Sequence, residues 1–442
     1  MTEIRKKLQT VTLGCSKNKV DTEHILSQVE HIYEIVPEGE DIPVDVLLIN
    51  TCGFIGDAKE ESVQAVLEAV DRKNRGEVKN VIVFGCLSQR YASEMPQLIP
   101  EVDAWFGARD FDPVIKELGA QPDPAKASSR YLTTPSHYAY LKISEGCDRR
   151  CSYCAIPFIR GGHKSVPMET LVEEARRLAE RGVRELIIIA QDTTYYGLDL
   201  YRRRALAELL QKLSEVEGIH WIRIHYSYPA AFPEDVLDQM AENPKVCRYM
   251  DIPLQHIADK VLDNMHRNVD GAWTRELIRK MREKVPGVVL RTTMIVGHPG
   301  EGKRAFAELL DFVKEARFER LGAFKYSEEE GTYGADNFKD TISKRVKQER
   351  LDELMTLQSE ISLAYNQSRV GSEIEVIVDD FVDAVFVCRS EYESPEVDGE
   401  ILVKYDSSVM GDIDPYSMIG DFMKVRVIGA DEYDLIAEPI EI

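Results

Sequence analysis

The chain has 442 residues, of which 55 are lysine or arginine and 77 are aspartate or glutamate, so its formal charge is −22 at pH 7. With 44% hydrophobic residues, this balance is typical of a folded protein and excludes a disordered one, and the length is enough for two or three domains. No apolar stretch approaches the length of a membrane span, and none follows the charged first residues as in a secretory signal, so we expect a cytoplasmic protein with no membrane partner.

Short apolar runs alternate with helical periodicity between residues 11 and 118. Strands are predicted at 11–13, 46–49 and 81–84, and helices at 21–31, at 58–72 and near Met95. This order predicts an open parallel sheet with helices on its faces. We assign it to a first domain at residues 1–122 and expect the stretch 121–129, rich in proline, alanine and serine, to be a linker.

A second alternating series occupies the middle of the chain. Six strands are predicted at 138–143, 186–190, 221–226, 249–252, 288–296 and 321–325, with helices that include 169–181, 205–216 and 272–285. Such a series predicts a partial (β/α)6 barrel, which binds ligands where its strands end. We assign it to residues 133–368, including most of a long helix predicted at 343–369.

After residue 371 the sequence pattern changes to short runs of β-branched and aromatic residues, which are separated by turn residues. Five strands are predicted at 373–378, 384–388, 401–405, 422–428 and 433–437. This pattern predicts a small antiparallel β-barrel, a third domain at residues 369–442. The fold class is therefore α/β, with an all-β domain at the end.

The spacing of the cysteines is the most informative feature of the sequence. Cys147, Cys151 and Cys154 lie in one loop just after the first strand of the second domain. Three thiolates can hold three irons of a [4Fe-4S] cluster and leave the fourth iron open. The alternatives are a chance cluster or a structural zinc site, which would need a fourth ligand.

Three further cysteines are dispersed in sequence but follow equivalent predicted strands. Cys15, Cys52 and Cys86 each come directly after one of the three strands of the first domain. The ends of parallel strands meet along one crevice, so the three thiols are predicted to converge and to bind a second cluster. The alternative is that they are small buried hydrophobic residues, which is the role we expect for Cys247 and Cys388.

Cys147 to Cys154 resembles the cluster loop of the radical S-adenosylmethionine (SAM) superfamily. Residues 12–15 (TLGC), 50–52 (NTC) and 85–86 (GC) resemble the N-terminal domain of the methylthiotransferases within that superfamily, and the last barrel resembles their TRAM domain. Residues 249–256, 326–332 and 389–399 are similar to the branch that acts on protein S-twelve of the small ribosomal subunit. Other branches modify tRNA adenosines, which is the alternative function. His298 departs from the family, which has an aromatic residue there.

The resemblance implies two [4Fe-4S] clusters, SAM and an electron donor. The cluster on Cys147, Cys151 and Cys154 would reduce SAM to methionine and a 5′-deoxyadenosyl radical, which takes hydrogen from the β-carbon of an aspartate in protein S-twelve. The cluster on Cys15, Cys52 and Cys86 would supply sulfur, which a second SAM methylates. An unactivated C–H bond cannot be attacked by a general base, so no residue is assigned as a catalytic acid or base. Candidate SAM contacts stand at the strand ends, although each could instead be a turn or core residue: Gln191, Asp192, His225, Ser227, Arg291 and Gly297.

Charge separates the two possible substrates. Residues 370–442 contain 19 acidic residues and four basic ones, a balance that would repel RNA and attract a basic ribosomal protein. Among these acids we expect Glu391, Glu393, Glu396 and Asp398 to contribute to binding that protein. The alternative is an acidic surface that only aids solubility. A non-catalytic electron carrier is disfavoured because it needs neither an open iron nor a SAM site.

Overall fold

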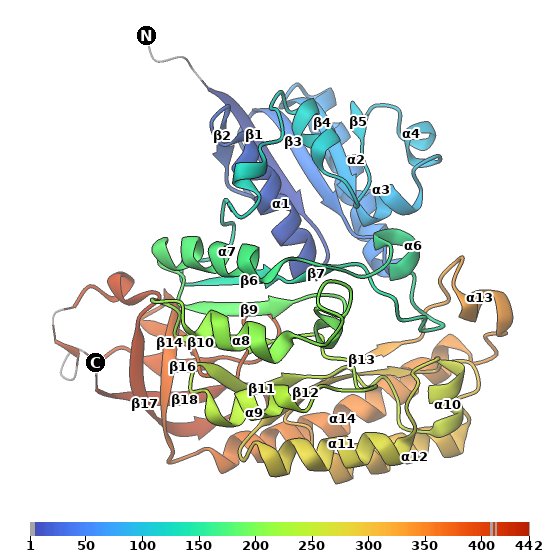
Figure 1. Cartoon of the computed structure of the whole chain (residues 1–442), viewed down its shortest axis with the longest axis vertical. Helices are drawn as coiled ribbons and strands as arrows, with labels where there is room; N and C mark the ends of the chain where they lie inside the picture. Colours follow the sequence, from blue (N-terminus) through green and yellow to red (C-terminus); the bar gives the residue numbers. More distant parts are fainter. Residues whose placement is uncertain (1–4, 407–409, 412, 442) are drawn as a thin grey trace.

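The computed structural model describes residues 5–406, 410–411 and 413–441. Figure 1 shows three parts in chain order: an N-terminal sheet with helices, a central sheet flanked by helices, and a small barrel near the C-terminus. Helix α1 (Ser16–Val29) of the first part points toward strand β6 (Tyr138–Lys142) of the second. In the part of the chain that is described, no helix is both long and apolar enough to cross a membrane.

The N-terminal sheet has five parallel strands in the order β2-β1-β3-β4-β5. The inner strands β3 and β4 contain near-continuous apolar runs because both faces are covered: Leu47 and Ile49 pack on one side, and Leu48 on the other. The edge strands β2 and β5 are too short to give a sequence pattern. The elements are β1 (Lys6–Thr12), α1 (Ser16–Val29), β2 (Tyr33–Val36), β3 (Val44–Thr51), α2 (Gly56–Asn74), β4 (Val78–Gly85), α3 (Cys86–Arg90), α4 (Met95–Leu98), β5 (Ala104–Trp105) and α5 (Asp112–Glu117).

The central domain contains the six predicted strands in one parallel sheet of order β13-β12-β11-β10-β9-β6. Its two edge strands do not pair with each other, so the sheet is an open, partial barrel. The elements are β6 (Tyr138–Lys142), β7 (Ser144–Glu145), α6 (Ile156–Arg160), β8 (Lys164–Ser165), α7 (Met168–Glu180), β9 (Glu185–Ile189), α8 (Leu206–Ser214), β10 (Trp221–Ile224), α9 (Asp235–Glu242), β11 (Val246–Asp251), α10 (Asp259–Asn264), α11 (Gly271–Lys284), β12 (Val289–Val296), α12 (Lys303–Ala316), β13 (Arg320–Lys325), α13 (Tyr333–Asn337) and α14 (Lys344–Ser368).

The C-terminal strands form a closed barrel of order β14-β15-β16-β18-β17. The sequence predicts the barrel correctly, but one pairing differs: β16 and β18 are parallel. Five strands cannot alternate in direction all the way round a closed ring, so one pair has to be parallel. The strands are β14 (Glu373–Val382), β15 (Val385–Arg389), β16 (Ile401–Lys404), β17 (Phe422–Ala430) and β18 (Leu435–Glu441).

The loop between β15 and β16 packs into the open side of the central sheet. The guanidinium of Arg223 donates to the carbonyl oxygen of Glu391 at 2.7 Å, and the hydroxyl of Tyr249 donates to Asp398 at 2.6 Å. Ser394 contacts the ring of His225 at 2.9 Å. The loop therefore connects the barrel to the central domain.

This placement corrects the expectation of binding a basic partner for two of the four loop acids, Glu393 and Asp398, whose side chains are buried against the central domain. Glu393 is only 1% exposed and pairs with Arg320 and Arg369. Glu396 pairs with Lys19 of the N-terminal domain at 2.7 Å, while Asp398 accepts from Tyr249. The charge of Glu393 therefore balances buried arginines, whereas Glu396 remains exposed on the surface.

Glu393 makes the docking of the C-terminal barrel sensitive to acid. Burial alone would raise the pKa of Glu393, but the guanidinium groups of Arg369 and Arg320 lower it to about 2. A carboxylate with a depressed pKa stabilises the fold above its unfolded pKa, and this contribution is lost as the pH falls toward the folded pKa.

We therefore expect the wild type to lose about 3 kcal/mol of stability from this one group as the pH falls from about 4.5 to about 2. Glu393→Gln removes the titrating group, so its stability should be lower at neutral pH and should change less on acidification. Guanidinium unfolding of both proteins along a pH series measures this difference. Parallel acid profiles for the two proteins would contradict the assignment.

Candidate functional site

The N-terminal sheet brings Cys15, Cys52 and Cys86 together. Each cysteine lies at or just past the end of a strand, and Cys15 is the N-cap residue of α1. Gly14 has a φ of +89°, and a Cβ atom there would lie 2.9 Å from Sγ of Cys52. A Cβ atom on Gly53 would meet the backbone carbon of Cys86 at 2.8 Å. Glycine is therefore required at both positions for the three segments to approach so closely.

A buried arginine from the central domain completes this group. Arg160, on α6, donates from Nε to Sγ of Cys86 at 3.2 Å and pairs with Asp21 at 2.7 Å. It also contacts Asn18 and Glu145. The N-terminal trio of cysteines thus has a positive charge beside it that no sequence pattern predicts, because Arg160 is distant from all three cysteines in the chain.

Cys147, Cys151 and Cys154 form the second trio, in the loop between β7 and α6. Sγ of Cys151 lies 3.5 Å from a guanidinium nitrogen of Arg267 and 3.8 Å from the hydroxyl of Tyr228. The backbone N–H of Arg149 points to Sγ of Cys147 at 3.4 Å. Arg267 and Tyr228 are not predicted as site residues from the sequence, since no local motif marks either of them.

The donor chemistry of both trios fits iron–sulfur clusters. Burial raises the pKa of Cys86 to about 11 and that of Cys147 to about 12, so iron has to displace protons from these thiols when it binds. Among the described residues, no three His, Cys, Asp or Glu side chains surround one point as the ligands of a single metal ion do. A [4Fe-4S] cluster holds each thiolate on a different iron, so three cysteines can bind it without surrounding one point.

Three of the candidate SAM contacts either lie near the second trio or have a buried polar atom without a hydrogen-bond partner in the described structure. Asp192 is buried and pairs at 2.9 Å with Arg149, which is inside the cysteine loop. Gln191 donates to Glu145 at 2.6 Å. In the described structure, Oε1 of Gln191 and Oγ of Ser227 are buried without a hydrogen-bond partner. Unsatisfied buried polar atoms at strand ends are what a site for a polar cofactor requires.

The other three candidates already have partners elsewhere in the chain. Burial lowers the pKa of His225 to about 3, and this neutral ring contacts Ser394 of the C-terminal barrel. Arg291 pairs with Asp251 at 2.8 Å and faces Asp398 at 3.8 Å. Gly297 packs against the side chain of Lys347, where a Cβ atom would collide. Contact between SAM and any of the six residues stays a prediction.

His298, the departure from the family pattern, takes the place of an aromatic side chain. It is fully buried, and its ring lies 4.8 Å from the ring of Tyr326 in an edge-on arrangement. Burial lowers the pKa of His298 to about 4, so the ring is neutral.

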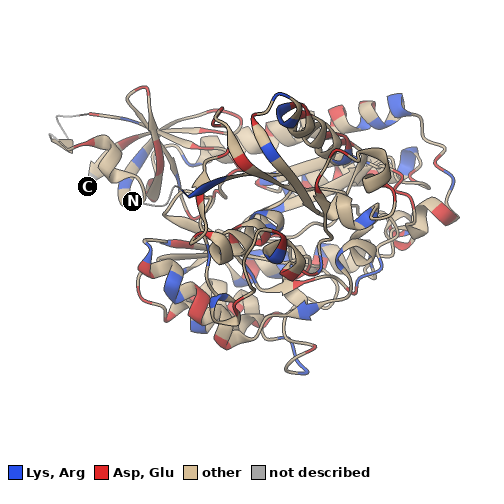
Figure 2. Ribbon diagram, turned by 90° about the horizontal axis from the view of Figure 1, so that it is seen from above, with Lys and Arg blue, Asp and Glu red and all other residues tan. Residues whose placement is uncertain are grey.

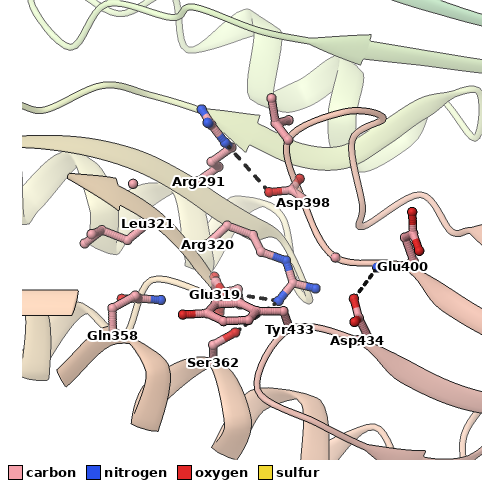
Figure 3. A pocket seen from close by; sticks show the side chains of 13 residues that line it. Arg291, Glu319, Arg320, Leu321, Gln358, Ser362, Asp398, Glu400, Tyr433 and Asp434 are labelled. Carbon is pink, nitrogen blue, oxygen red and sulfur yellow. Dashed lines mark hydrogen bonds and ion pairs between the residues drawn. The ribbon is translucent and has the colours of Figure 1, made fainter. Parts of the chain in front are cut away.

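A pocket of about 490 Å³ lies at the junction of the central domain, α14 and the barrel (Figure 3). Arg291 and Arg320 point toward it, as do Asp398 and Tyr433. Neither trio of cysteines contributes to its lining, and both arginines are already ion-paired. It is a gap beside the docked barrel and does not belong to the cysteine sites.

The two buried arginines are expected to tune the two clusters separately. A hydrogen bond to a charged group is worth roughly 1.5 kcal/mol, or about 60 mV for one electron. Removing the positive charge makes reduction harder, so Arg267→Met and Arg160→Met should each lower one reduction potential by this order. A redox titration followed by electron paramagnetic resonance, with the lysine variants as controls, measures the shifts. A shift of both clusters in one variant would contradict two separate sites.

Three family models match the chain: Radical SAM superfamily at residues 141–313, Uncharacterized protein family UPF0004 at residues 7–107, and TRAM domain at residues 370–440. Proteins named ribosomal protein uS12 methylthiotransferase RimO are similar over almost the whole length. The one from Phocaeicola vulgatus is 49% identical over 434 residues, 98% of this chain and 99% of that protein. The one from Porphyromonas gingivalis strain W83 is 49% identical over 438 residues, 99% of this chain and 100% of that protein.

Solved structures are similar in fold. The radical S-adenosylmethionine methyltransferase TsrM from Kitasatospora setae has a TM-score of 0.57 and 12% identity, covering 75% of this chain and 74% of its own. The cobalamin-dependent S-adenosylmethionine radical enzyme OxsB has a TM-score of 0.51 and 11% identity, covering 80% of this chain and 56% of its own. Taken with the order of the three domains and the two trios of cysteines, the identity to the uS12 methylthiotransferases shows that this chain belongs to the methylthiotransferase family of radical SAM enzymes.

Proposed function

We propose that this protein adds a methylthio group to the β-carbon of an aspartate in ribosomal protein uS12. The observation that carries the proposal is the pair of cysteine trios at one junction, each with its own buried arginine. The names of the full-length relatives support uS12 as the substrate. A cytoplasmic location fits this substrate, since ribosomes work there.

The cofactors of the family are SAM and [4Fe-4S] clusters, which when bound supply one-electron cleavage of SAM and the sulfur. We propose Cys147, Cys151 and Cys154 as ligands of the first cluster, and Cys15, Cys52 and Cys86 as ligands of the second. We place the domains at residues 1–122, 133–368 and 369–442. Around these sites the chain provides orientation and exclusion of water, and an electron donor has to reach the first cluster.

The surface of the C-terminal barrel supports a basic protein partner. Figure 2 shows the acidic and basic residues on the ribbon, and residues 370–442 contain 19 acids against four bases. With Glu393 and Asp398 turned inward, the exposed acids among the described residues of this domain are Glu373, Glu375, Asp380, Asp383, Glu396, Glu400, Asp406, Asp414, Asp421, Asp431, Glu432 and Glu438. Complementary charge of this kind speeds association and excludes RNA.

The substrate is tested by offering both candidates to the reconstituted enzyme. With SAM, sulfide and a reductant, uS12 should gain the mass of one methylthio group on an aspartate, and bulk tRNA should gain none. Modified adenosine in the tRNA and unmodified uS12 would overturn the proposal and favour the alternative.

The role of the barrel needs its own variant. Asp380, Asp383 and Asp421 are exposed and lie on or beside β14, since the backbone oxygen of Asp421 accepts from the backbone N–H of Val378 and Asp383 follows the end of this strand. Changing all three to lysine should slow association with uS12, most strongly at low salt. The matched control changes three exposed glutamates of the central domain to lysine: Glu180 on α7, Glu353 on α14 and Glu217 in the turn after α8. Equal slowing in both variants would show a general charge effect and no role for the barrel.

A further inference from the structure

One buried lysine at the junction of the first two domains lacks an acidic partner. Lys17 is in the first turn of α1, two residues after Cys15, and is 7% exposed. Its ammonium lies over the ring of Tyr226, 3.3 Å from the ring centroid. Within the described residues it forms no ion pair with a carboxylate. A buried charge without a counter-charge is costly, so its retention needs a reason.

The cations around Lys17 are different, because each of them already has an acidic partner. Lys142 and Arg160 share Asp21 and Glu145. The other neighbouring cations pair as follows: Lys19 with Glu396, Arg149 with Asp192, and Arg291 with Asp251. Among the described residues Lys17, like Arg267 beside the second trio, has no carboxylate partner, so it is available to an acidic group from outside the chain.

Lys17 lies beside the first trio of cysteines and next to two candidate SAM contacts. It follows Cys15 of the first trio, and Tyr226, beneath its ammonium, stands past the end of β10 between two candidate SAM contacts. Tyr226 has a φ of 59° and is held by its backbone N–H, which donates to Asp251 at 2.8 Å. The left-handed backbone fixes the ring under Lys17, and strain of this kind is typical of functional sites.

We propose that Lys17 binds the side-chain carboxylate of the acceptor residue. This inference rests on the proposed function, in which the carbon that receives sulfur is bonded directly to a carboxylate carbon. A cation that holds the carboxylate therefore holds a group that is one bond away from that carbon, beside the first trio. It also neutralises a charge that would be expensive to bury alone. A site built around such a partner rejects analogues that lack it much more strongly than an apolar pocket can.

A thermodynamic cycle tests the contact. The holoenzyme and its Lys17→Met variant, which keeps an unbranched chain of similar length, are each titrated with uS12 and with uS12 carrying Asn at the acceptor aspartate. We expect the wild type to bind the Asn protein at least about 30-fold more weakly than the Asp protein. The Lys17→Met variant should bind both proteins with the same affinity, because the charge that distinguishes them is gone. Lys19→Met, on the same helix but paired with Glu396, is the matched control and should discriminate like the wild type.

Two further measurements keep the proposal testable. If Lys17→Met does not load iron, Lys17→Arg replaces it: this variant keeps the charge and should still bind the Asp form of uS12 more tightly than the Asn form. The comparison of the two forms with the wild-type enzyme still applies. SAM also has a carboxylate, so SAM affinity is measured in each variant. Discrimination that survives in Lys17→Met, or a loss of SAM affinity without a loss of discrimination, would overturn the proposal. If wild-type enzyme does not modify uS12 at all, the proposed function fails; if it does and Lys17→Met still discriminates, only this inference fails.

Discussion

We expect the variant in which Cys147, Cys151 and Cys154 are replaced together by alanine to keep one [4Fe-4S] cluster and to lose SAM cleavage completely. The three thiols lie in one loop beside Arg267, and no thiol of the N-terminal trio contacts that loop's arginine or tyrosine partners among the described residues. Iron and sulfide analysis after anaerobic reconstitution, with methionine and 5′-deoxyadenosine as products, measures both effects.

The converse variant separates the two trios. Replacing Cys15, Cys52 and Cys86 by alanine should also leave one cluster, but SAM cleavage should continue without insertion of sulfur. Cys247 and Cys388, which are buried in packed surroundings, provide the control, because their replacement by alanine should not change the iron content. If the wild type binds one cluster only, the assignment of the N-terminal trio is wrong.

The convergence of the N-terminal trio is visible in the sequence because the fold enforces it. Parallel strands end at one edge, so a cysteine after each of three strands is brought to one place whatever the rest of the domain does. The six strands of the central sheet are predictable for a related reason: each is a short buried run between amphipathic helices. Local sequence patterns are enough to predict the fold where the structure repeats one unit of a strand followed by a helix.

Partners that come from distant segments are not predictable in this way. Arg160 reaches Cys86 across a domain boundary, and Arg267 reaches Cys151 from the end of α10. Neither contact has a sequence motif, because guanidinium groups on long side chains are equally common on exposed helices. Only the tertiary packing decides which arginines become buried.

The acidic loop at 390–400 shows the same limit for charge. Net charge predicts the overall sign of a surface, yet it does not tell which carboxylates are already neutralised internally. Glu393 and Asp398 are acidic in sequence and satisfied in the structure by Arg320 and Tyr249. The surface that we propose for the basic partner therefore lies on the outer strands of the barrel and not at these two residues.

The polar network that docks the barrel on the central domain has Glu185 at its centre. Glu185 is fully buried on β9, and its two oxygens accept from Arg223 and Arg389, both at 2.7 Å. Arg389 also pairs with Asp379 of the barrel. Burial alone would raise the pKa of Glu185, but the two guanidinium groups lower it, so the carboxylate is charged in the folded protein.

Glu185→Gln should destabilise the docked barrel by about 3–5 kcal/mol, because it leaves two buried guanidinium groups with too little negative charge. Trp221 reports on this interface, since its ring lies 4.9 Å from that of Phe422 on the barrel. Guanidinium unfolding is followed by Trp221 fluorescence after Trp105 and Trp273 have been changed to phenylalanine. The control is Glu373→Gln, whose exposed pair with Arg426 should contribute nothing measurable. Equal midpoints for Glu185→Gln and its parent would show that the network does not hold the barrel, and that the apolar contact at Trp221 is sufficient.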